Sequence, residues 1–448
     1  MISSLFAASQ DIRQGRRTPV EVLEACLARI DQLESRVHAW VLIDRDGARR
    51  EAEKRTKELR EGHYRGPLHG IPIGIKDIFD VFDWPTAAGS RLWKQSIARQ
   101  DSTCVRKCRE AGAVFIGKTV TTQYASFDPP PTSNPWNTAR TPGGSSSGSA
   151  AALACGMCLG ALGSQTGGSI TRPASYCGIP AIKPTYGRVS CHGVVPLAPS
   201  MDHPGPMARS LRDVALLLQV LAGPDPLDPS TVNRPVPDYL AALERPTPPP
   251  RLGRLRGLFE EMAHPDVREM MENVAGKLGA AGASVIEVSP PAAFAEVIQR
   301  HRIVMAVEAA MFHEPRLRHH PEDYGPRILS LLQEGLACSA TEYARTKEHQ
   351  RQLREEILIC FEGVDGLILP ATTCPAPDAG TTGDPAFNSP WSYTGLPAVS
   401  FLSGWTTDGL PLGVQIVGRP WSEAELLALA AWCEPRLEVE QRDPALLK

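Results

Sequence analysis

The sequence of 448 residues predicts an α/β protein in which helices enclose a β-sheet. Two observations predict this class: amphipathic helical patterns alternate with short apolar, strand-like runs, and the chain is long enough to bury a large core. A chain of this length can also divide into several domains, but large α/β enzymes reach this size as one unit. No internal repeat or low-complexity domain is apparent in it.

Residues 1–65 are expected to form a helical N-terminal segment. Its strongest signal is the run Thr18-Pro-Val-Glu21, in which Thr18 can cap a helix, Pro19 fits the first turn and Glu21 completes a capping box. The charged residues 51–60 predict a second helix with a solvated face. Apolar residues of the first helix recur at helical spacing, at Val20, Leu23, Leu27 and Ile30.

The central part of the chain is expected to alternate between strands and helices. Short β-rich runs predict strands at 70–75 and 114–116, with a helix at 103–111 before the second strand. Apolar and small residues predict two further helices, at 150–162 and 209–221, and the second of these ends at the turn sequence GPDPLDP.

A proline-rich connector, RPTPPPR at 245–251, is expected to be exposed and extended. Such a segment could mark a domain boundary, but we interpret it as a surface loop inside one unit, because motifs of one family lie on both sides of it. Beyond it we expect strands at 257–259, 284–288, 366–370 and 412–417, and helices at 267–282 and across 298–333.

The charge balance gives no electrostatic reason to expect nucleic acid or a membrane as a partner. The chain has 47 basic and 50 acidic side chains and a formal net charge of −3. We interpret the basic residues around 316–320 as a solvated helix end. The sequence shows no secretory signal and no apolar span of about 18 residues. We therefore expect a cytoplasmic protein whose eleven cysteines are reduced, buried thiols.

The most informative stretch is residues 141–174, where two glycine–serine clusters flank an alanine-rich run. In the second cluster, Gly167, Gly168 and Ser169 can present a hydroxyl beside bare backbone N–H groups. Acyl transfer needs this arrangement, because a nucleophile attacks a carbonyl while N–H donors hold the oxyanion that forms. The upstream run GIPIGIKD, residues 70–77, supplies Lys76 as a base, and Ser145 can relay protons between the two.

With these residues in this order, the chain resembles the amidase signature family of Ser–Ser–Lys hydrolases. The resemblance covers nearly the whole chain and extends to the runs AGAVFIGKT, CGIPAIKPTYGRVS, DHPGPMARS, DGLILPATTCPAP, GLPAVS and PLGVQIVGRP. It implies one domain over residues 1–448, with a mixed central sheet covered by helices on both faces and the catalytic motifs within 66–215. It implies no metal and no organic cofactor.

The resemblance also assigns roles to three side chains: Ser169 is the nucleophile, Ser145 the relay and Lys76 the base. Lys76 ends an apolar run, and burial lowers the pKa of a lysine and makes it a usable base. Asp77 could oppose that shift, but we interpret it as structural. The oxyanion hole is expected at the backbone amides of Thr166, Gly167, Gly168 and Ser169, with glycines that can adopt unusual backbone angles.

Ser145 is chosen among three adjacent serines because the relay of the family is the first serine after the glycine pair. In the family this residue follows a cis peptide bond, here the bond from Gly144. Ser146 is expected to support the site by hydrogen bonding. Ser147 stands where the family has glycine, and it would be strained if that position requires a positive φ.

The surroundings of the nucleophile depart from the family. The common form reads SDTGGSIR, whereas here Gln165 replaces the acid and the arginine sits one place later, at Arg172, after Thr171. The two changes together suggest a swapped local hydrogen-bond arrangement. The roles of Gln165 and Arg172 therefore do not carry over from the family.

Several other motifs are interpreted as structural. The run GAVFIGKT at 112–119 matches a phosphate-binding P-loop, but the segment before it is helical and the run itself is strand-like, so we reject that function. Cys155 and Cys158 form a CxxC motif that we assign to buried packing. His192, His203, His319 and His320 are not expected to be catalytic or to bind metal. Five aromatic residues could line a substrate pocket or equally pack in the core: Tyr124, Phe127, Trp136, Trp391 and Tyr393.

The sequence thus predicts an amide hydrolase acting on carbon–nitrogen bonds other than peptide bonds, which releases a carboxylic acid and ammonia or an amine. One alternative is the glutamine-hydrolysing component of a tRNA-dependent amidotransferase, which would need a partner protein. Another is a catalytically silent binding protein on the same scaffold. A small-molecule amide is the expected substrate, of a class that the sequence does not distinguish, and a homodimer is expected by family analogy.

Overall fold

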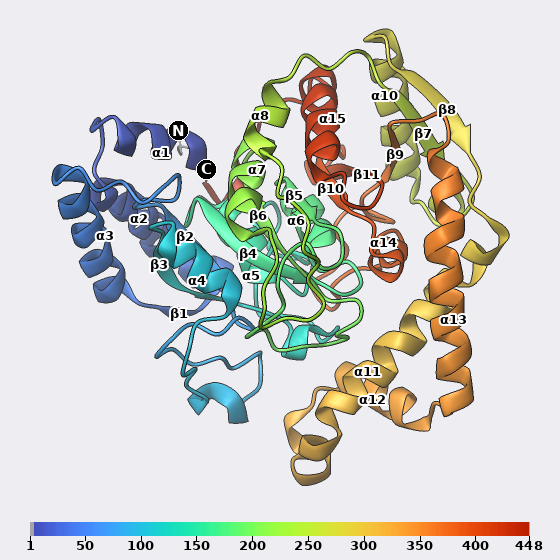
Figure 1. Cartoon of the computed structure of the whole chain (residues 1–448), viewed down its shortest axis with the longest axis horizontal. Helices are drawn as coiled ribbons and strands as arrows, with labels where there is room; N and C mark the ends of the chain where they lie inside the picture. Colours follow the sequence, from blue (N-terminus) through green and yellow to red (C-terminus); the bar gives the residue numbers. More distant parts are fainter. Residues whose placement is uncertain (1–3, 448) are drawn as a thin grey trace.

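The computed structural model describes residues 4–447, which form a single large α/β domain built on one mixed sheet of eleven strands (Figure 1). The strand order is β1-β3-β2-β4-β6-β5-β10-β11-β9-β7-β8. Strand β2 is parallel to β3 and β4, and β7 is parallel to β8 and β9, whereas the other neighbours are antiparallel. The strands are β1 Trp40–Ile43, β2 Pro72–Lys76, β3 Val114–Thr119, β4 Gly160–Gln165, β5 Ala181–Lys183, β6 His203–Ala208, β7 Arg251–Leu255, β8 Ser284–Val288, β9 Gly366–Pro370, β10 Ala398–Trp405 and β11 Pro411–Val417.

Helices cover both faces of this sheet. In β4, a side chain at Gly160 would meet Leu217 of α7, whereas one at Gly163 would meet Ser146 at the start of α5, so these two helices lie on opposite faces. The α-helices of the described residues are α1 Leu5–Arg13, α2 Pro19–Val37, α3 Arg45–Arg60, α4 Thr103–Glu110, α5 Ser147–Ala154, α6 Thr171–Cys177, α7 Leu211–Leu221, α8 Tyr239–Glu244, α9 Leu258–Glu261, α10 Pro265–Ala280, α11 Val297–His319, α12 Pro326–Ala337, α13 Ala340–Glu356, α14 Ser389–Thr394 and α15 Glu423–Arg436.

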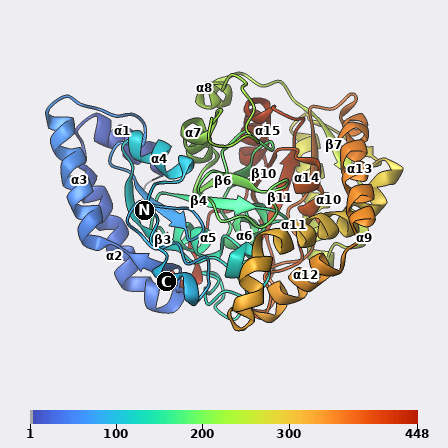
Figure 2. The same ribbon diagram turned by 60° about the horizontal axis from the view of Figure 1, so that its bottom comes forward.

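The two ends of the molecule are built from different parts of the chain. Helices α2 and α3 lie at one end, and α11, α12 and α13 lie at the other, as both Figure 1 and Figure 2 show. The end of the chain returns to α2, where Arg36 donates a hydrogen bond to the carbonyl of Leu446.

The sheet brings two predicted site segments to one edge. Strands β2 and β4 are parallel neighbours, with Ile75 opposite Leu162, so their carboxyl ends meet. Lys76 ends β2, and the loop after Gln165 of β4 leads into α6. In α/β sheets, sites form outside the carboxyl ends of the strands, and the candidate site lies at such an edge.

Most of the expected elements are confirmed. The capping box at Thr18 and Glu21 starts α2, and the expected segments at 51–60, 103–111, 209–221 and 267–282 overlap helices. The expected strands at 70–75, 114–116, 284–288, 366–370 and 412–417 correspond to β2, β3, β8, β9 and β11. The N-terminal segment 1–65 also contains a strand, β1.

Three expectations are wrong in part. The helix expected over 150–162 ends at Ala154, because Gly156 takes a positive φ of 69°, and the chain then continues as β4. The strand expected at 257–259 lies earlier, at β7: the last residue of the connector, Arg251, already pairs with Ser284, and Gly257 instead precedes α9. The helical stretch 298–333 is two helices, α11 and α12, with Pro321 and Pro326 between them and at the start of the second.

Candidate active site

Lys76 is completely buried, and no carboxylate contacts its amine. The Nζ atom lies 2.7 Å from the Oγ atom of Ser145 and 2.8 Å from the Oγ atom of Ser164. Burial holds the pKa of Lys76 well below the usual value of lysine, and the negative charge of Asp202 opposes this shift. A neutral amine can accept a proton from a neighbouring hydroxyl, so the pair is suited to proton transfer.

Asp77 follows Lys76 but forms its ion pair with another residue. Its Oδ1 atom lies 2.8 Å from the Nζ atom of Lys118, and both side chains are buried. The structural interpretation of Asp77 therefore fits the geometry, and the carboxylate that opposes the shift of Lys76 is Asp202.

The three adjacent serines have different surroundings. The Gly144–Ser145 peptide bond is cis, as the family resemblance implied. The hydroxyl of Ser146 lies 3.3 Å from both the backbone nitrogen and the carbonyl oxygen of Ser164. Ser147 begins α5 without a positive φ and donates to the carbonyl of Gly143, so it is not strained as it would be in a left-handed conformation.

The loop between β4 and α6 exposes N–H groups and ties down its carbonyls. The carbonyls of Thr166, Gly167, Gly168 and Ser169 accept hydrogen bonds from His301, Ser392, Arg172 and Ser146, respectively. Within residues 4–447, the N–H groups of Gly167, Gly168 and Ser169 donate to no acceptor. The loop therefore presents unpaired donors of the kind that stabilise an oxyanion.

Ser169 lies on this loop and is 7% exposed. Its hydroxyl forms no hydrogen bond with the described part of the chain, whereas its carbonyl accepts from the N–H of Ser146 at 3.3 Å. The structure thus joins Lys76 directly to Ser145, and it joins Ser169 to this group through the backbone of Ser146.

The two glycines before Ser169 do not serve as expected. Neither Gly167 nor Gly168 has a positive φ, so the expectation of unusual backbone angles is wrong for both. At Gly168 the reason for glycine is space, since a Cβ atom there would lie 2.7 Å from the Oδ1 atom of Asn388. At Gly167 a Cβ atom would make only ordinary contacts of 3.5 Å or more.

The swapped arrangement around Gln165 is a neutral one. The Oε1 atom of Gln165 accepts from the N–H groups of Ile170 and Thr171, at 2.9 and 3.0 Å, and from the hydroxyl of Thr171 at 3.1 Å. Arg172 points elsewhere and donates from Nη2 to the carbonyl of Gly144 at 2.8 Å. Gln165 therefore fixes the start of α6, and Arg172 fixes the backbone before Ser145.

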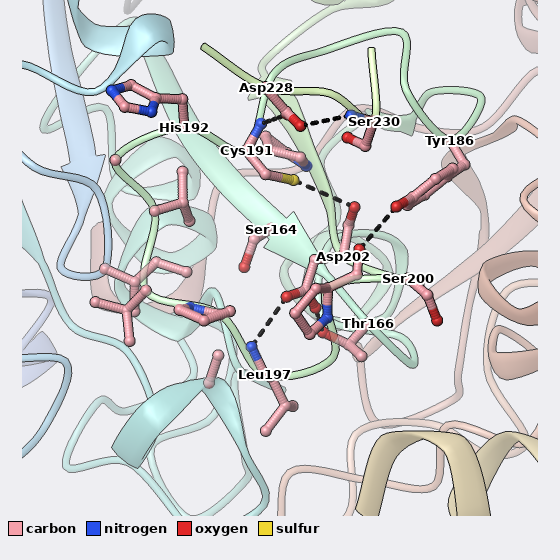
Figure 3. Close-up of a pocket in the computed structure, with 18 of the residues that line it drawn as sticks. Ser164, Thr166, Tyr186, Cys191, His192, Leu197, Ser200, Asp202, Asp228 and Ser230 are labelled. Carbon is pink, nitrogen blue, oxygen red and sulfur yellow. Dashed lines mark hydrogen bonds between the residues drawn. The ribbon is translucent and has the colours of Figure 1, made fainter. Parts of the chain in front are cut away.

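A cavity of about 560 Å³ opens beside this group of residues (Figure 3). Ser164 and Thr166 line it from the end of β4, and Asp202 lies beside Thr166, whose hydroxyl donates to its carboxylate. Of the described residues that line the cavity, none is lysine or arginine, and two are aspartates, Asp202 and Asp228. The rest of the wall is mainly apolar, including Val194, Val195, Pro196, Leu197 and Leu227.

The five aromatic residues proposed for a pocket do not line this cavity. Tyr124 is buried and donates to Asp323, and Trp391 is buried, stacks on Phe259 and donates to the carbonyl of Phe387. The other three have similar surroundings: Phe127 packs on the core, Trp136 donates to the carbonyl of Cys177, and Tyr393 donates to the carbonyl of Thr346. Of the two interpretations left open, these contacts favour packing.

The motifs judged structural have ordinary surroundings. Lys118 of the P-loop-like run lies inside β3, where it cannot belong to a phosphate loop. Cys155 and Cys158 are buried, and burial raises the pKa of both thiols, that of Cys155 to about 12. His203 is buried with its Nδ1 atom against the carbonyl of Met201, and His192 contacts Gln100. Between residues 4 and 447 there is no group of three metal-binding side chains, and no helix there is both long and apolar enough to span a membrane.

The family model for Amidase matches residues 21–427. The chain belongs to the amidase family. It is 38% identical to AmiD of Mycobacterium tuberculosis, which carries the name of an amidase, over 92% of this chain and 89% of AmiD. It is 34% identical to the GatA-type component of the glutamyl-tRNA(Gln) amidotransferase of a Synechococcus strain, with 97% of each chain covered.

Solved structures of amidase proteins share the fold. One, described as a vestigial protein complex that reveals the evolutionary origins of an s-triazine catabolic enzyme, superposes with a TM-score of 0.91 at 31% identity. The superposition covers 97% of this chain and 98% of that one.

Sequence reasoning missed three residues that contact the site. Ser164 lies five residues before Ser169 in the same glycine–serine cluster, a position that could have suggested a role in the site. His301 and Ser392 hold the carbonyls of Thr166 and Gly167 from α11 and α14, more than a hundred residues away in the chain. A lone histidine or serine within a helix carries no sequence signal for such a contact.

Proposed function

We propose that this amidase cleaves a carboxamide through an acyl-enzyme at Ser169, with Ser145 as relay and Lys76 as base. The observation that carries the proposal is the placement of Lys76: a buried amine of lowered pKa, 2.7 Å from a serine hydroxyl and without a carboxylate partner. A lysine that is merely structural would be expected to pair with an acid, as Lys118 does with Asp77.

The proposed steps begin with neutral Lys76. It takes the proton of Ser145, Ser145 takes the proton of Ser169, and the Ser169 oxygen attacks the amide carbonyl. The tetrahedral intermediate collapses when the relay protonates the leaving amine. Water then enters by the reverse route, which releases the acid and restores Ser169.

The proposed oxyanion hole is formed by the backbone amides from Thr166 to Ser169. Its support is that the N–H groups of Gly167, Gly168 and Ser169 are unpaired while their carbonyls are all held. Removing one oxyanion donor costs about 10²–10³ in rate in other enzymes, so this loop can account for a large part of the catalysis.

We propose that the substrate is a small, uncharged amide other than a peptide bond. The cavity beside the loop carries apolar side chains, hydroxyls and two aspartates, and none of its described lining residues is a lysine or arginine that would bind a carboxylate. Glutamine bears such a carboxylate, which counts against the second candidate function, the glutamine-hydrolysing component of an amidotransferase. That candidate is supported by the 34% identity to the Synechococcus protein over 97% of both chains.

A charge insertion tests this substrate class. Leu227 lines the cavity and is 60% exposed, so Leu227→Arg places a cation at its rim, and Leu227→Gln is the uncharged control. We expect Leu227→Arg to raise kcat/KM for a carboxylate-bearing amide by on the order of tenfold, about 1.4 kcal/mol, without raising it for a neutral one. Efficient hydrolysis of glutamine by the wild type would overturn the proposed class.

The function itself is tested by ammonia release from a panel of aryl, aliphatic, urea-derived and peptide C-terminal amides, together with glutamine. Activity should vanish in Ser169→Ala and persist in Ser147→Ala, whose hydroxyl contacts only the carbonyl of Gly143. Equal activity in wild type and Ser169→Ala would exclude the proposed nucleophile. Activity on glutamine that depends on a tRNA-binding partner would favour the amidotransferase component.

The silent scaffold is tested separately with a fluorophosphonate, which reacts with activated serines. Absence of labelling of Ser169 in folded protein would favour that alternative. Two further proposals accompany the hydrolase: a homodimer, tested by its mass in solution, and a cytoplasmic location, which the eleven free thiols support.

A further inference from the structure

His301 makes a hydrogen bond that ties the oxyanion loop to a distant helix. It lies in α11, is buried, and its Nε2 atom is 2.8 Å from the carbonyl oxygen of Thr166. A carbonyl oxygen only accepts, so Nε2 carries the proton and the imidazole is held in that tautomer. Burial lowers the pKa of His301 to about 4, which leaves the ring neutral at neutral pH.

Thr166 is held from two sides. Its carbonyl accepts from His301, and its hydroxyl donates to the buried carboxylate of Asp202. Because the peptide unit is planar, fixing the Thr166 carbonyl also fixes the N–H of Gly167, which points the opposite way. That N–H is one of the unpaired donors of the loop.

The same helix also supports the second of these contacts. Glu308 lies seven residues after His301, on the same face of α11, and accepts from the N–H of Ser200 at 2.8 Å. Ser200 belongs to the loop that leads to Asp202, so α11 supports both partners of Thr166.

We propose that His301 is a positioning residue of this amidase, which aims the Gly167 N–H at the oxyanion through the Thr166 carbonyl. The inference rests on the proposed function, since it assumes that an oxyanion forms at this loop. His301 itself touches neither the substrate nor the reacting atoms in this scheme. A misplacement of about 1 Å in a catalytic group can cost about 10²-fold in rate, so the effect is measurable.

The experiment compares three variants. His301→Leu removes the donor, and His301→Gln keeps an N–H donor on a side chain of similar reach. His313→Leu is the matched control, because His313 also lies buried in α11 with its pKa lowered to about 4, but contacts Tyr324. The first measurement is the second-order rate of fluorophosphonate labelling at Ser169, which needs no known substrate and places a phosphoryl oxygen in the oxyanion hole.

We expect His301→Leu to label about 10- to 100-fold more slowly, with His301→Gln and His313→Leu within about threefold of the wild type. With an active amide, kcat should fall by the same factor and KM should not change. A His301→Leu protein that is folded by circular dichroism and labels at the wild-type rate would overturn the inference. So would an equal loss in His313→Leu or in His301→Gln. Failure of the wild type to label would instead count against the proposed function.

Discussion

Lys76 and Asp77 are neighbours in the chain, yet they do not form an ion pair with each other. Asp77 pairs with Lys118 at 2.8 Å, whereas the amine of Lys76 lies between the hydroxyls of Ser145 and Ser164. Two buried lysines on adjacent strands thus have opposite surroundings. Lys118 has a carboxylate that favours its charged form, and Lys76 has none in contact.

The first prediction concerns the stability cost of this arrangement. Lys76→Met removes a buried amine whose pKa is held well below the usual value by burial. In the wild type the unfolded chain binds more protons at Lys76 than the folded one, so its stability should rise with pH toward the ordinary pKa of lysine. Lys76→Met should lack this component, unfold at a higher temperature near neutral pH, and have no amidase activity.

Lys183→Met is the matched control for this prediction. Lys183 is also fully buried with a pKa well below the usual value, and its amine donates to the carbonyl of Pro184. Thermal unfolding across pH should show a similar gain in stability for this variant, with activity retained. A Lys76→Met protein that is less stable than the wild type and no longer folds would contradict the interpretation of Lys76 as an uncompensated buried base.

The second prediction concerns the pH dependence of activity. Only neutral Lys76 can act as a base, so kcat/KM should rise with pH through the pKa of Lys76 and then level off. The negative charge of Asp202 raises that pKa, so Asp202→Asn should move the rising limb to lower pH, even though the variant also loses rate through Thr166. Profiles measured between about pH 5 and pH 9 decide this; a limb at higher pH in the variant would refute it.

The third prediction compares two adjacent glycines. A Cβ atom at Gly168 would lie 2.7 Å from Asn388 Oδ1 and 3.1 Å from its Cβ, whereas at Gly167 the nearest atom is 3.5 Å away. Gly168→Ala should therefore displace the loop and lower kcat by about 10²-fold, while Gly167→Ala keeps its fold and a Tm near that of the wild type. Equal kinetics and equal Tm for the two variants would show that Asn388 does not limit the loop.

The sequence predicted the local elements well where one physical signal dominates. The capping box before α2 and the apolar runs of β2, β3 and β11 are examples. Strand β6 has no such signal, because its sequence HPGPMA contains two prolines that cannot donate to a ladder. The run 150–162 failed for the opposite reason: small apolar residues fit a buried helix and a buried strand equally.

For the site, the residues that react and the residues that position them differ in predictability. Lys76, Ser145 and Ser169 lie in short glycine-rich runs whose composition indicates chemistry. His301 and Ser392 act through single contacts made only when distant helices pack on the loop, and no local pattern marks them. The partner of Asp77 is equally non-local, since Lys118 is reached through the pairing of β2 and β3.

The last prediction concerns Gln165, where this chain departs from the acid and arginine of the common family form. Its Oε1 atom satisfies the N–H groups of Ile170 and Thr171 at the start of α6. Gln165→Leu leaves both buried donors unpaired, at about 1–3 kcal/mol each, so it should lower the free energy of unfolding by several kcal/mol and reduce kcat through the attached loop. Thr171→Val removes only the hydroxyl contact and should cost about 1 kcal/mol. Denaturant unfolding of both variants measures the difference. If the two lose equal stability, the backbone contacts of Gln165 are not what holds the start of α6, and the neutral pair is an accident of sequence rather than a replacement for the charged one.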